Sequence, residues 1–267
     1  MIKIAVLITC FNRRKKTIRC LNNLFKQKIH QNIRLTVYLT DDGSTDYTSI
    51  YVKKQFPEVK IFTGNGNLYW GRGTNLVFKE AAKKNFDYYL WLNDDTYLLK
   101  GALDDLLNAK NEIQSKTFIS VGSTKNKYNI LTYGGQKNKG SKISPFKNKI
   151  IFPNKNYQII DRFNGNIVLI SREAQKKIGF INKDLVHISG DIEYGIRASI
   201  LKIPIFLCPN FQGICENDKK RNLLKDYFRG KCLIKSFFIL TKKYGGIFWI
   251  LHFLSALLHS LKIFKLK

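Results

Sequence analysis

The sequence predicts an α/β fold with a doubly wound, mainly parallel sheet, followed by a basic, amphipathic helical segment. Short apolar runs alternate with segments of helical periodicity over the first 120 residues, an order typical of parallel sheets. The chain has 267 residues and is 44% hydrophobic, which suits one large α/β domain with an appendage. The composition becomes basic, aromatic and rich in Leu and Ile after about residue 216. We therefore expect a main domain over 1–215 and a helical segment over 216–267.

The first elements follow from their periodicity. Residues 3–9 form a continuous apolar run, as expected of a strand that is buried on both faces. A helix predicted over 12–28 places Ile18, Leu21 and Leu24 on one face. The same alternation then predicts strands at 33–40, 59–62 and 86–92, and helices at 46–56, 72–84 and 100–114.

The second half of the main domain is less regular. Residues 117–170 predict shorter strands with basic, glycine-containing loops, which we expect to form a mixed-sheet extension that covers a site. Helices are predicted at 172–180 and 190–202, and a last short strand at 203–208.

The cysteines and the N-terminus indicate a reducing compartment. An odd number of cysteines without a C-x-x-C pair, and without suitably placed His residues, fits no zinc pattern. We expect reduced, mostly buried thiols in a cytoplasmic protein. The N-terminal apolar run lacks a small-residue cleavage site and predicts a strand, not a signal peptide. The five cysteines are Cys10, Cys20, Cys208, Cys215 and Cys232.

The chain is strongly basic: it contains 46 Lys and Arg but only 19 Asp and Glu, which gives a formal net charge of +27. Such a chain fits nucleic acid, an anionic membrane surface or a phosphorylated small molecule as a partner, and biased codon usage is the alternative explanation. No nucleic-acid-binding motif or stacking platform is recognisable, so we expect no nucleic acid partner. The acids are concentrated in a few short motifs, mostly between Asp41 and Glu112.

Three polar clusters follow predicted strands directly. They are Thr9–Arg13, Asp41–Asp46 and Asn93–Asp95. Ligands of doubly wound sheets bind at the carboxyl ends of the strands, so the three clusters together predict a ligand site.

Each cluster also has a simpler explanation. Of Asp94 and Asp95, one can reach Mg²⁺ or Mn²⁺ together with substrate phosphates while its neighbour reaches a sugar hydroxyl, or the two form a turn and helix cap. The turn at Asp41–Asp46 can accept a hydrogen bond from the imide N–H of uracil or thymine, or be a solvated turn. The first loop opens a helix whose N-terminal amides favour phosphate. No G-x-G-x-x-G follows the first strand and no P-loop motif occurs, which argues against a dinucleotide-binding enzyme or a P-loop NTPase.

With these residues assembled, the chain resembles family 2 glycosyltransferases of the GT-A fold over roughly residues 1–215. Six motifs in the expected order carry this resemblance. They are Thr9-Cys10-Phe11-Asn12-Arg13, Thr40-Asp41-Asp42-Gly43-Ser44-Thr45-Asp46, Gly66-Asn67 with Gly71-x-Gly73-x-Asn75, Leu92-Asn93-Asp94-Asp95, Phe163-Asn164-Gly165-Asn166 followed by Arg172, and Gly190-Asp191-Ile192-Glu193-Tyr194-Gly195-Ile196-Arg197.

The resemblance implies a role for each matched position. Asp42 would bind the nucleobase, Asp94 the ribose or donor sugar, Asp95 a divalent Mn²⁺ or Mg²⁺ ion, and Asp191 would be the general base. The backbone at Gly165 would approach the donor sugar closely, and a plain turn is the alternative. The remaining positions would line the donor pocket: Thr9, Phe11, Asn12, Arg13, Asn67 and Asn75.

The activity implied is inverting transfer of a sugar from a nucleotide sugar, with UDP- or dTDP-sugars favoured. The acceptor would be a hydroxyl of a glycan or lipid-linked glycan in the synthesis of a surface polysaccharide such as capsule or O-antigen. A sugar-nucleotide nucleotidyltransferase and, less favoured, a basic nucleic-acid-binding protein are the alternatives.

Four other side chains have competing explanations. Glu193 and Arg197 have the i, i+4 spacing of an intrahelical ion pair, which we favour over direct catalysis. His187 either faces the acceptor or is a buried structural histidine. For Trp70, core packing is favoured over stacking on a sugar.

The C-terminal segment predicts contact with a membrane surface. Residues 244–261 carry no formal charge and are flanked by Lys242, Lys243 and Lys262. A membrane span needs about 20 apolar residues, so this stretch is marginal, and a helix lying in the plane of an anionic membrane fits better. We expect a peripheral protein on the inner face of the cell membrane. A helix packed on the main domain, or a homodimer interface, is the alternative.

Overall fold

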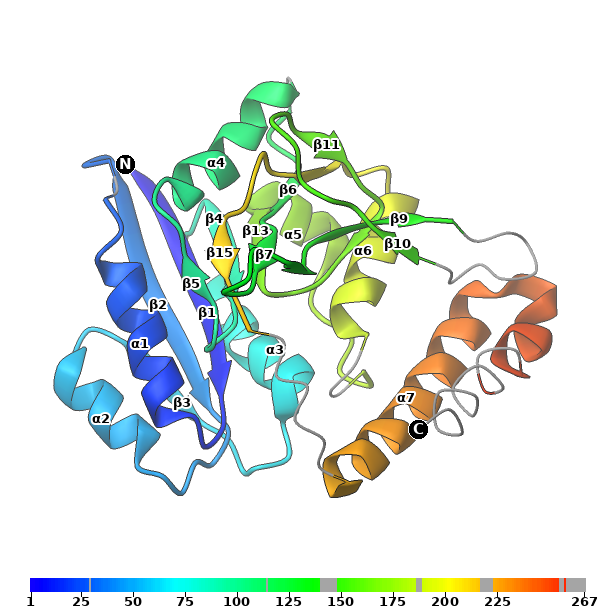
Figure 1. The fold of residues 1–267 in the computed structure, drawn as a ribbon, viewed down its shortest axis with the longest axis horizontal. Helices are drawn as coiled ribbons and strands as arrows, with labels where there is room; N and C mark the ends of the chain where they lie inside the picture. Colours follow the sequence, from blue (N-terminus) through cyan, green and yellow to red (C-terminus); the bar gives the residue numbers. More distant parts are fainter. Residues whose placement is uncertain are drawn as a thin grey trace.

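The computed structural model describes residues 1–28, 30–113, 115–139, 148–185, 189–216, 223–254 and 257, with the side chains of 223–233 left aside. Its centre is a mixed sheet of eight strands (Figure 1). In spatial order the strands are β11 (Gln158–Ile159), β14 (Ile205–Leu207), β6 (Ile119–Val121), β13 (Ile167–Ser171), β4 (Tyr88–Leu92), β1 (Ile2–Cys10), β2 (Ile33–Asp41) and β3 (Lys60–Thr63).

The predicted parallel half of the sheet is confirmed. Strand β1 pairs in parallel with both β2 and β4, and β2 pairs in parallel with β3. The register places Thr9 opposite Thr40 and Cys10 opposite Asp41, so the two strands end side by side. Strand β13 lies antiparallel between β4 and β6, which makes the whole sheet mixed.

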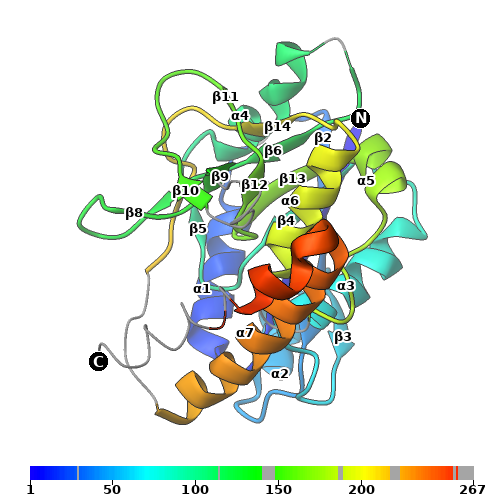
Figure 2. The ribbon, with the colours of Figure 1, turned by 90° about the vertical axis from the view of Figure 1, so that its right-hand side faces the viewer.

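Helices cover both faces of the sheet and build two apolar cores (Figure 2). One face carries α3 (Tyr69–Ala82), α5 (Arg172–Ile178) and α6 (Gly190–Ile200), and the other carries α1 (Arg14–Phe25), α2 (Thr48–Gln55) and α4 (Ala102–Asn108), which continues as η1 (Ala109–Glu112). The central strands are apolar on both sides because each side faces helices. In α1, the predicted inward residues Leu21 and Leu24 are fully buried.

The predicted mixed extension over 117–170 is confirmed only in part, because β6, β11 and β13 of this region join the central sheet. Its other strands enter two small sheets, one antiparallel and one mixed. A three-stranded sheet has the order β10 (Asn148–Ile150), β9 (Gly135–Asn138), β12 (Arg162–Phe163). A four-stranded sheet has the order β5 (Tyr97–Leu98), β15 (Gly213–Ile214), β7 (Thr124–Lys125), β8 (Leu131–Tyr133).

The C-terminal segment folds as a helical hairpin. Helix α7 (Leu223–Tyr244) ends before a tight turn at Gly245, which is followed by η2 (Gly246–Phe248) and a helical stretch over 249–254. A Cβ atom at Gly245 would lie 2.5 Å from the carbonyl oxygen of Thr241, so this turn requires glycine. The turn at Gly245 therefore interrupts the charge-free stretch 244–261 near its start. Residues 255, 256 and 258–261, which belong to it, lie outside the described residues. Within the described part of the chain, no helix is long and apolar enough to cross a membrane.

Candidate active site

The loops after β1 and β2 are joined at the carboxyl edge of the sheet. The backbone N–H of Asn12 donates to Ser44 Oγ at 2.9 Å, and the N–H of Thr45 donates to Asn12 Oδ1 at 2.8 Å. Asn12 adopts a left-handed conformation with φ 51°, which asparagine tolerates better than most residues. Asp46 accepts a bond from the N–H of Arg14 at 2.9 Å and so ties the second loop to the first turn of α1. Two of the predicted polar clusters therefore form one surface.

The third cluster joins them through Arg13. Its Nη1 donates to Asp94 Oδ1 at 3.0 Å and to Asp95 Oδ2 at 2.9 Å. Asp94 is almost fully buried, and this burial raises its pKa to about 7, although Arg13 lowers the pKa in part. The side chain of Asp95 is 17% exposed and accepts a weak hydrogen bond from Cys215 Sγ at 3.7 Å. The acidic turn is thus neutralised in part by a cation from the first loop.

The acidic turn fits a divalent ion as part of a site. Carboxylate oxygens are the ligands that Mg²⁺ and Mn²⁺ prefer, and Mg²⁺ commonly binds one or two carboxylates plus substrate phosphates. Among the described residues, no group of three or more His, Cys, Asp or Glu side chains is arranged to hold a metal. Asp95, whose side chain is partly exposed, can supply a carboxylate ligand, and a bound phosphate would supply others.

Asp42 organises the loop before α3. Its carboxylate is 2% exposed and accepts backbone N–H bonds from Gly66, Leu68 and Tyr69 at 2.8–2.9 Å. A Cβ atom at Gly64 would lie 2.4 Å from Asp42 Oδ1, so the loop passes very close to this carboxylate. A nucleobase that contacts Asp42 directly would have to donate to lone pairs of the carboxylate oxygens that these three hydrogen bonds do not use.

Thr9 forms the contact between β1 and α3. Its Oγ1 lies 3.1 Å from Thr74 Oγ1, and a Cβ atom at Gly73 would lie 2.4 Å from Thr9 Cγ2. Glycine at position 73 therefore allows the helix to approach the strand end. Asn75 follows on α3; it is 6% exposed, and its Oδ1 accepts no hydrogen bond from the described protein.

Two predicted pocket residues are exposed at this edge. Phe11 is 47% exposed although it directly follows the buried strand β1. Asn67 is exposed too, and its N–H donates to Asn65 Oδ1 at 3.1 Å within the loop. An exposed aromatic side chain beside polar loops offers a flat surface for a base.

Trp70 connects the acidic turn with Asp191. Its Nε1 donates to Asn93 Oδ1 at 2.8 Å, beside the two aspartates. A Cβ atom at Gly165 would lie 2.4 Å from Trp70 Cζ2, so the ring packs directly on this glycine. The N–H of Gly165 in turn donates to Asp191 Oδ2 at 2.9 Å. The favoured prediction of packing for Trp70 is confirmed, and the absent side chain of Gly165 makes room for that ring.

Asp191 occupies the first turn of α6. Its surroundings raise the pKa of this carboxyl because burial disfavours the charge, while bonds from the N–H groups of Gly165 and Ile192 act against that shift. The two backbone donors therefore fix the position of the carboxylate, and burial makes it a stronger base than an ordinary aspartate. His187, the other residue predicted near the acceptor, lies outside the described residues.

The predicted ion pair of Glu193 is confirmed, with partners that the sequence did not indicate. Glu193 is fully buried and accepts a bond from Arg197 Nε at 2.9 Å. Its other oxygen accepts bonds from Lys243 Nζ at 2.9 Å and from the Tyr244 hydroxyl at 2.7 Å. These two residues come from α7, about 50 positions along the chain, so no local spacing could reveal them. The carboxylate thus fastens α7 to the helix that carries Asp191.

A basic cavity of about 250 Å³ adjoins the acidic turn. It is lined by three cations of α1 and by side chains of the opposite wall: Lys15, Lys16, Arg19, Asp95, Tyr97 and Glu216. The guanidinium of Arg19 lies over the Tyr97 ring, 4.2 Å from its centroid. Cations so close to Asp95 favour an anionic ligand at this place.

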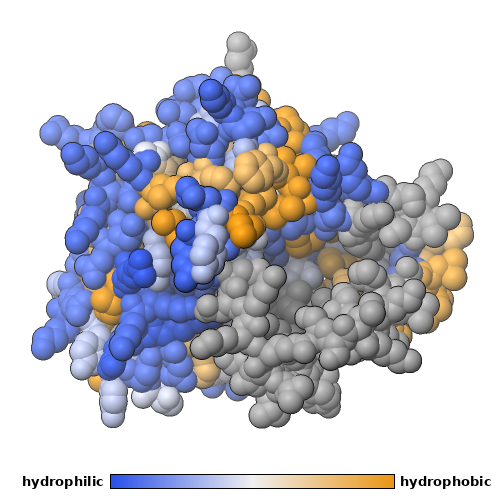
Figure 3. Space-filling view, in the orientation of Figure 1, coloured by the Kyte–Doolittle hydropathy of each residue, from blue (hydrophilic) through white to orange (hydrophobic). Residues whose placement is uncertain are grey.

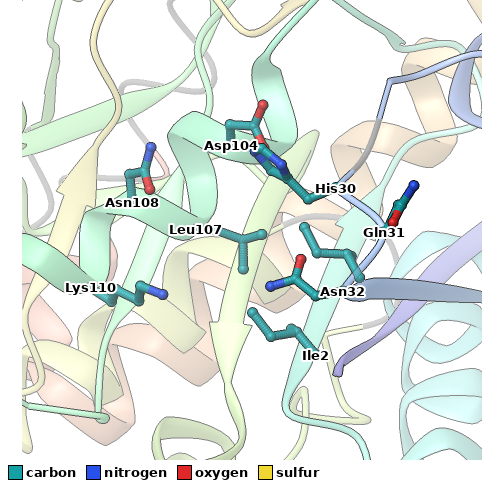
Figure 4. A pocket seen from close by; sticks show the side chains of 9 residues that line it. Ile2, His30, Gln31, Asn32, Asp104, Leu107, Asn108 and Lys110 are labelled. Carbon is teal, nitrogen blue, oxygen red and sulfur yellow. The ribbon is translucent and has the colours of Figure 1, made fainter.

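A second cavity, of about 570 Å³, lies at the opposite end of the sheet (Figure 4). It is lined by the first residues of β1 and β2, by the loop before β2, and by α4 with η1. His30 Nε2 lies 3.7 Å from Asp104 Oδ1. Ligands of doubly wound sheets bind at the carboxyl ends of the strands, and this cavity adjoins the amino ends. It contains none of the residues predicted for the site.

The cysteines agree with the expected reduced thiols where the structure describes them. Cys10, Cys20, Cys208 and Cys215 are free and buried. Burial raises the pKa of each of these thiols, which disfavours the reactive thiolate. The side chain of Cys232 lies outside the described part.

The mixed α/β sheet, with polar clusters at the carboxyl ends of β1, β2 and β4, agrees with the expected GT-A fold. The model of the family described as "Glycosyl transferase family 2" matches residues 5–179. The chain belongs to this family. A search of curated protein sequences found no match.

Solved structures show the same fold at low sequence identity. S. aureus TarS is 15% identical with a TM-score of 0.59, over 88% of this chain and 44% of that chain. The mannosyltransferase PcManGT from Pyrobaculum calidifontis, in complex with GDP-Man and Mn²⁺, is 13% identical with a TM-score of 0.61, over 97% of this chain and 73% of that chain. GalNAc-T7 with UDP, GalNAc and Mn²⁺ is 13% identical with a TM-score of 0.65, over 93% and 52%. This chain therefore spans less than half of TarS.

Proposed function

We propose that this glycosyltransferase moves a sugar from a nucleotide sugar, UDP- or dTDP-linked in the first instance, to a hydroxyl of a glycan or lipid-linked glycan. The observation that supports it most is the chain of contacts from Arg13 through the acidic turn and Trp70 to Asp191. It links a place for an anionic donor with a buried carboxylate that can accept a proton. Two of the similar structures contain GDP-Man or UDP, which supports a nucleotide-sugar donor in general.

The donor would lie along the carboxyl edge of β1, β2 and β4. Phe11 would stack on the base, and Asn12, Asn67 and the loop held by Asp42 would form the walls around it. The unpartnered Oδ1 of Asn75 can accept one hydrogen bond from the ligand or from water. Thr9 fixes α3 at the strand end and thereby the position of this wall.

The diphosphate would lie beside the acidic turn. When bound, a divalent ion held by Asp95 would offset the charge that develops on the departing diphosphate. Arg13 and the cations that line the basic cavity would add to this stabilisation. Asp94, behind Asp95, would contact the ribose or the donor sugar.

Asp191 would activate the acceptor. Its carboxylate takes the proton of the acceptor hydroxyl while that oxygen forms a bond to the anomeric carbon. The bond between this carbon and the diphosphate oxygen breaks on the opposite face, so the configuration inverts. The electron pair leaves with the nucleoside diphosphate.

Release of the nucleoside diphosphate tests the proposal. The purified protein is incubated with UDP-, dTDP-, GDP- and CMP-sugars and Mn²⁺, with and without glycan acceptors, and thermal shift is recorded in parallel. We expect one donor class to raise the melting temperature, since a ligand that binds the folded state stabilises it. No shift and no release with any donor would contradict the proposal.

The metal assignment is tested separately with Asp95→Ala. We expect calorimetry to show tight donor binding in Mn²⁺ for the unchanged protein and weak, Mn²⁺-independent binding for the variant. An affinity that is equal in both would remove Asp95 from the metal site.

A further inference from the structure

We propose that the C-terminal hairpin of α7, η2 and residues 249–254 is an interfacial membrane-binding surface for anionic lipid, attached rigidly to the helix that carries Asp191. The surface combines exposed apolar side chains, positive charge and a fixed connection to the main domain.

Several apolar side chains of the hairpin are exposed to solvent. After the turn, Ile247 is 90% exposed, and Leu251 is 59% exposed. Single exposed apolar residues are ordinary, but a contiguous group is not. Figure 3 shows an apolar area at the right edge of the molecule, where the end of α7 and η2 lie in Figure 1. The other strongly exposed members after the turn are Phe248, Ile250 and Leu254.

The two arms of the hairpin are held together by aromatic packing. The Phe238 ring on α7 lies 5.7 Å from the Trp249 ring and 5.6 Å from the Phe253 ring, both edge-on. Phe238 itself remains 40% exposed, and Ile234, one turn earlier, is also 40% exposed. The apolar surface is therefore shared by both arms and does not depend on a single helix.

The positive charge of residues 219–267 favours an anionic partner. Residues 219–267 contain twelve Lys and Arg and one acid, Asp226. Apolar side chains next to lysines bind anionic membranes by combining insertion at the interface with attraction to headgroups. Lys235 and Lys242 are exposed on the hairpin. A second copy of this chain would bring the same positive charge to the contact and would be repelled, so a lipid surface is the better partner.

The opposite face of α7 is anchored to the main domain. Leu240 is 3% exposed and packs with Leu185 and with Ile196 of α6. Lys243 and Tyr244 bind the buried Glu193, two residues from Asp191. Membrane contact would thus fix the orientation of the candidate active site relative to the bilayer. If the proposed function holds, on which this step rests, the acceptor is an amphiphile presented at the membrane surface.

Vesicle flotation tests the surface independently of activity. The full chain is mixed with vesicles of phosphatidylglycerol and phosphatidylcholine, or of phosphatidylcholine alone. We expect flotation with the anionic vesicles, and a decrease of at least about tenfold in partitioning for Ile247→Glu with Leu251→Glu. The matched control is Ile50→Glu with Ile159→Glu, which adds the same charge on α2 and β11, at exposed positions away from the hairpin. The control should float like the unchanged protein.

The remaining outcomes are also decisive. Equal flotation of the hairpin variant and the control would overturn the proposal. The proposal would also be overturned if the unchanged protein did not bind vesicles and formed a dimer in analytical ultracentrifugation, while the hairpin variant was monomeric. Donor-dependent release of nucleoside diphosphate, measured without vesicles for all variants, distinguishes failure of the surface from failure of the proposed function.

Discussion

Asp191 shows what a single side chain contributes to the proposed reaction. Two backbone N–H groups hold its carboxylate, and burial raises its pKa. A carboxyl with a raised pKa is a better base than an ordinary aspartate, provided that it is ionised at the working pH. Its protonation state and its position are therefore both set by the protein around it.

Replacing Asp191 by Asn should separate donor binding from transfer. The amide keeps the size of the side chain but cannot take a proton, so we expect the transfer rate to fall by about 10²- to 10⁴-fold. Donor affinity in calorimetry should change little. Transfer close to that of the unchanged enzyme would exclude Asp191 as the base, and a loss of donor binding would assign it to the donor pocket.

The pH profile provides a second test of the same residue. Below its pKa Asp191 carries a proton and cannot accept another, so kcat should fall as the pH decreases through that value. Because burial raises the pKa, we expect this decline at a higher pH than for an ordinary aspartate. The measurement is kcat against pH at saturating substrates. A kcat that stays constant down to pH 4 would contradict the assignment.

Among the elements, helix α3 depends on close contact with β1. The absent side chain of Gly73 leaves room for Thr9, and Thr40 Oγ1 donates to the carbonyl of Gly73 at 2.7 Å. The loop before this helix is the one that Asp42 holds. The contact at Gly73 thus couples the position of α3 to the end of β1 and to the loop that forms the pocket wall.

Gly73→Ala tests this coupling. The new methyl group would overlap Thr9 Cγ2, and we expect the free energy of unfolding to fall by about 1–3 kcal/mol in thermal or urea unfolding. Adding Thr9→Ser removes that methyl group and keeps a hydroxyl for Thr74, so the double variant should regain part of the loss. Equal stability of the single variant and the unchanged protein would show that the helix can shift at little cost.

The elements also show how far sequence reasoning extends. The first four strands and three helices agree with the predicted alternation because apolar periodicity is a local property. The antiparallel insertion of β13 between β4 and β6 could not be predicted, since strand pairing joins distant residues. At the site, the three strand-end clusters were predictable from position alone. The three backbone donors on Asp42, and the contact of Trp70 with Gly165, depend on how the loops pack and could not be foreseen.

For the molecule as a whole, the buried Glu193 joins the main domain to the C-terminal hairpin. Burial alone would raise its pKa, but Arg197, Lys243 and Tyr244 outweigh this effect and hold the pKa of the carboxyl below its ordinary value. A carboxyl with a lowered pKa stabilises the fold above its unfolded-state pKa. That contribution is lost as the pH falls through the folded-state value.

Removing the two hairpin partners should reveal this contribution. For Lys243→Met with Tyr244→Phe we expect the free energy of unfolding near pH 7 to fall by about 1.5–3 kcal/mol, as is typical for hydrogen bonds to a charged group. The difference should shrink when the pH is lowered far enough to protonate Glu193. Lys242→Met is the matched control, because it removes one charge from the same turn without touching Glu193. If the control loses as much stability, net charge and not the Glu193 contact is responsible.

The carboxylate of Asp42 has a consequence for the time scale of donor binding. With three amide groups of residues 66–69 bonded to a buried acceptor, this wall of the pocket exists before any ligand arrives. A preformed wall has little conformational entropy left to lose, so association need not wait for the loop to order. Those three amides should exchange slowly with deuterium even without ligand. Discrimination between donor bases would then come from the fit to a rigid surface, and not from a closing movement of this loop.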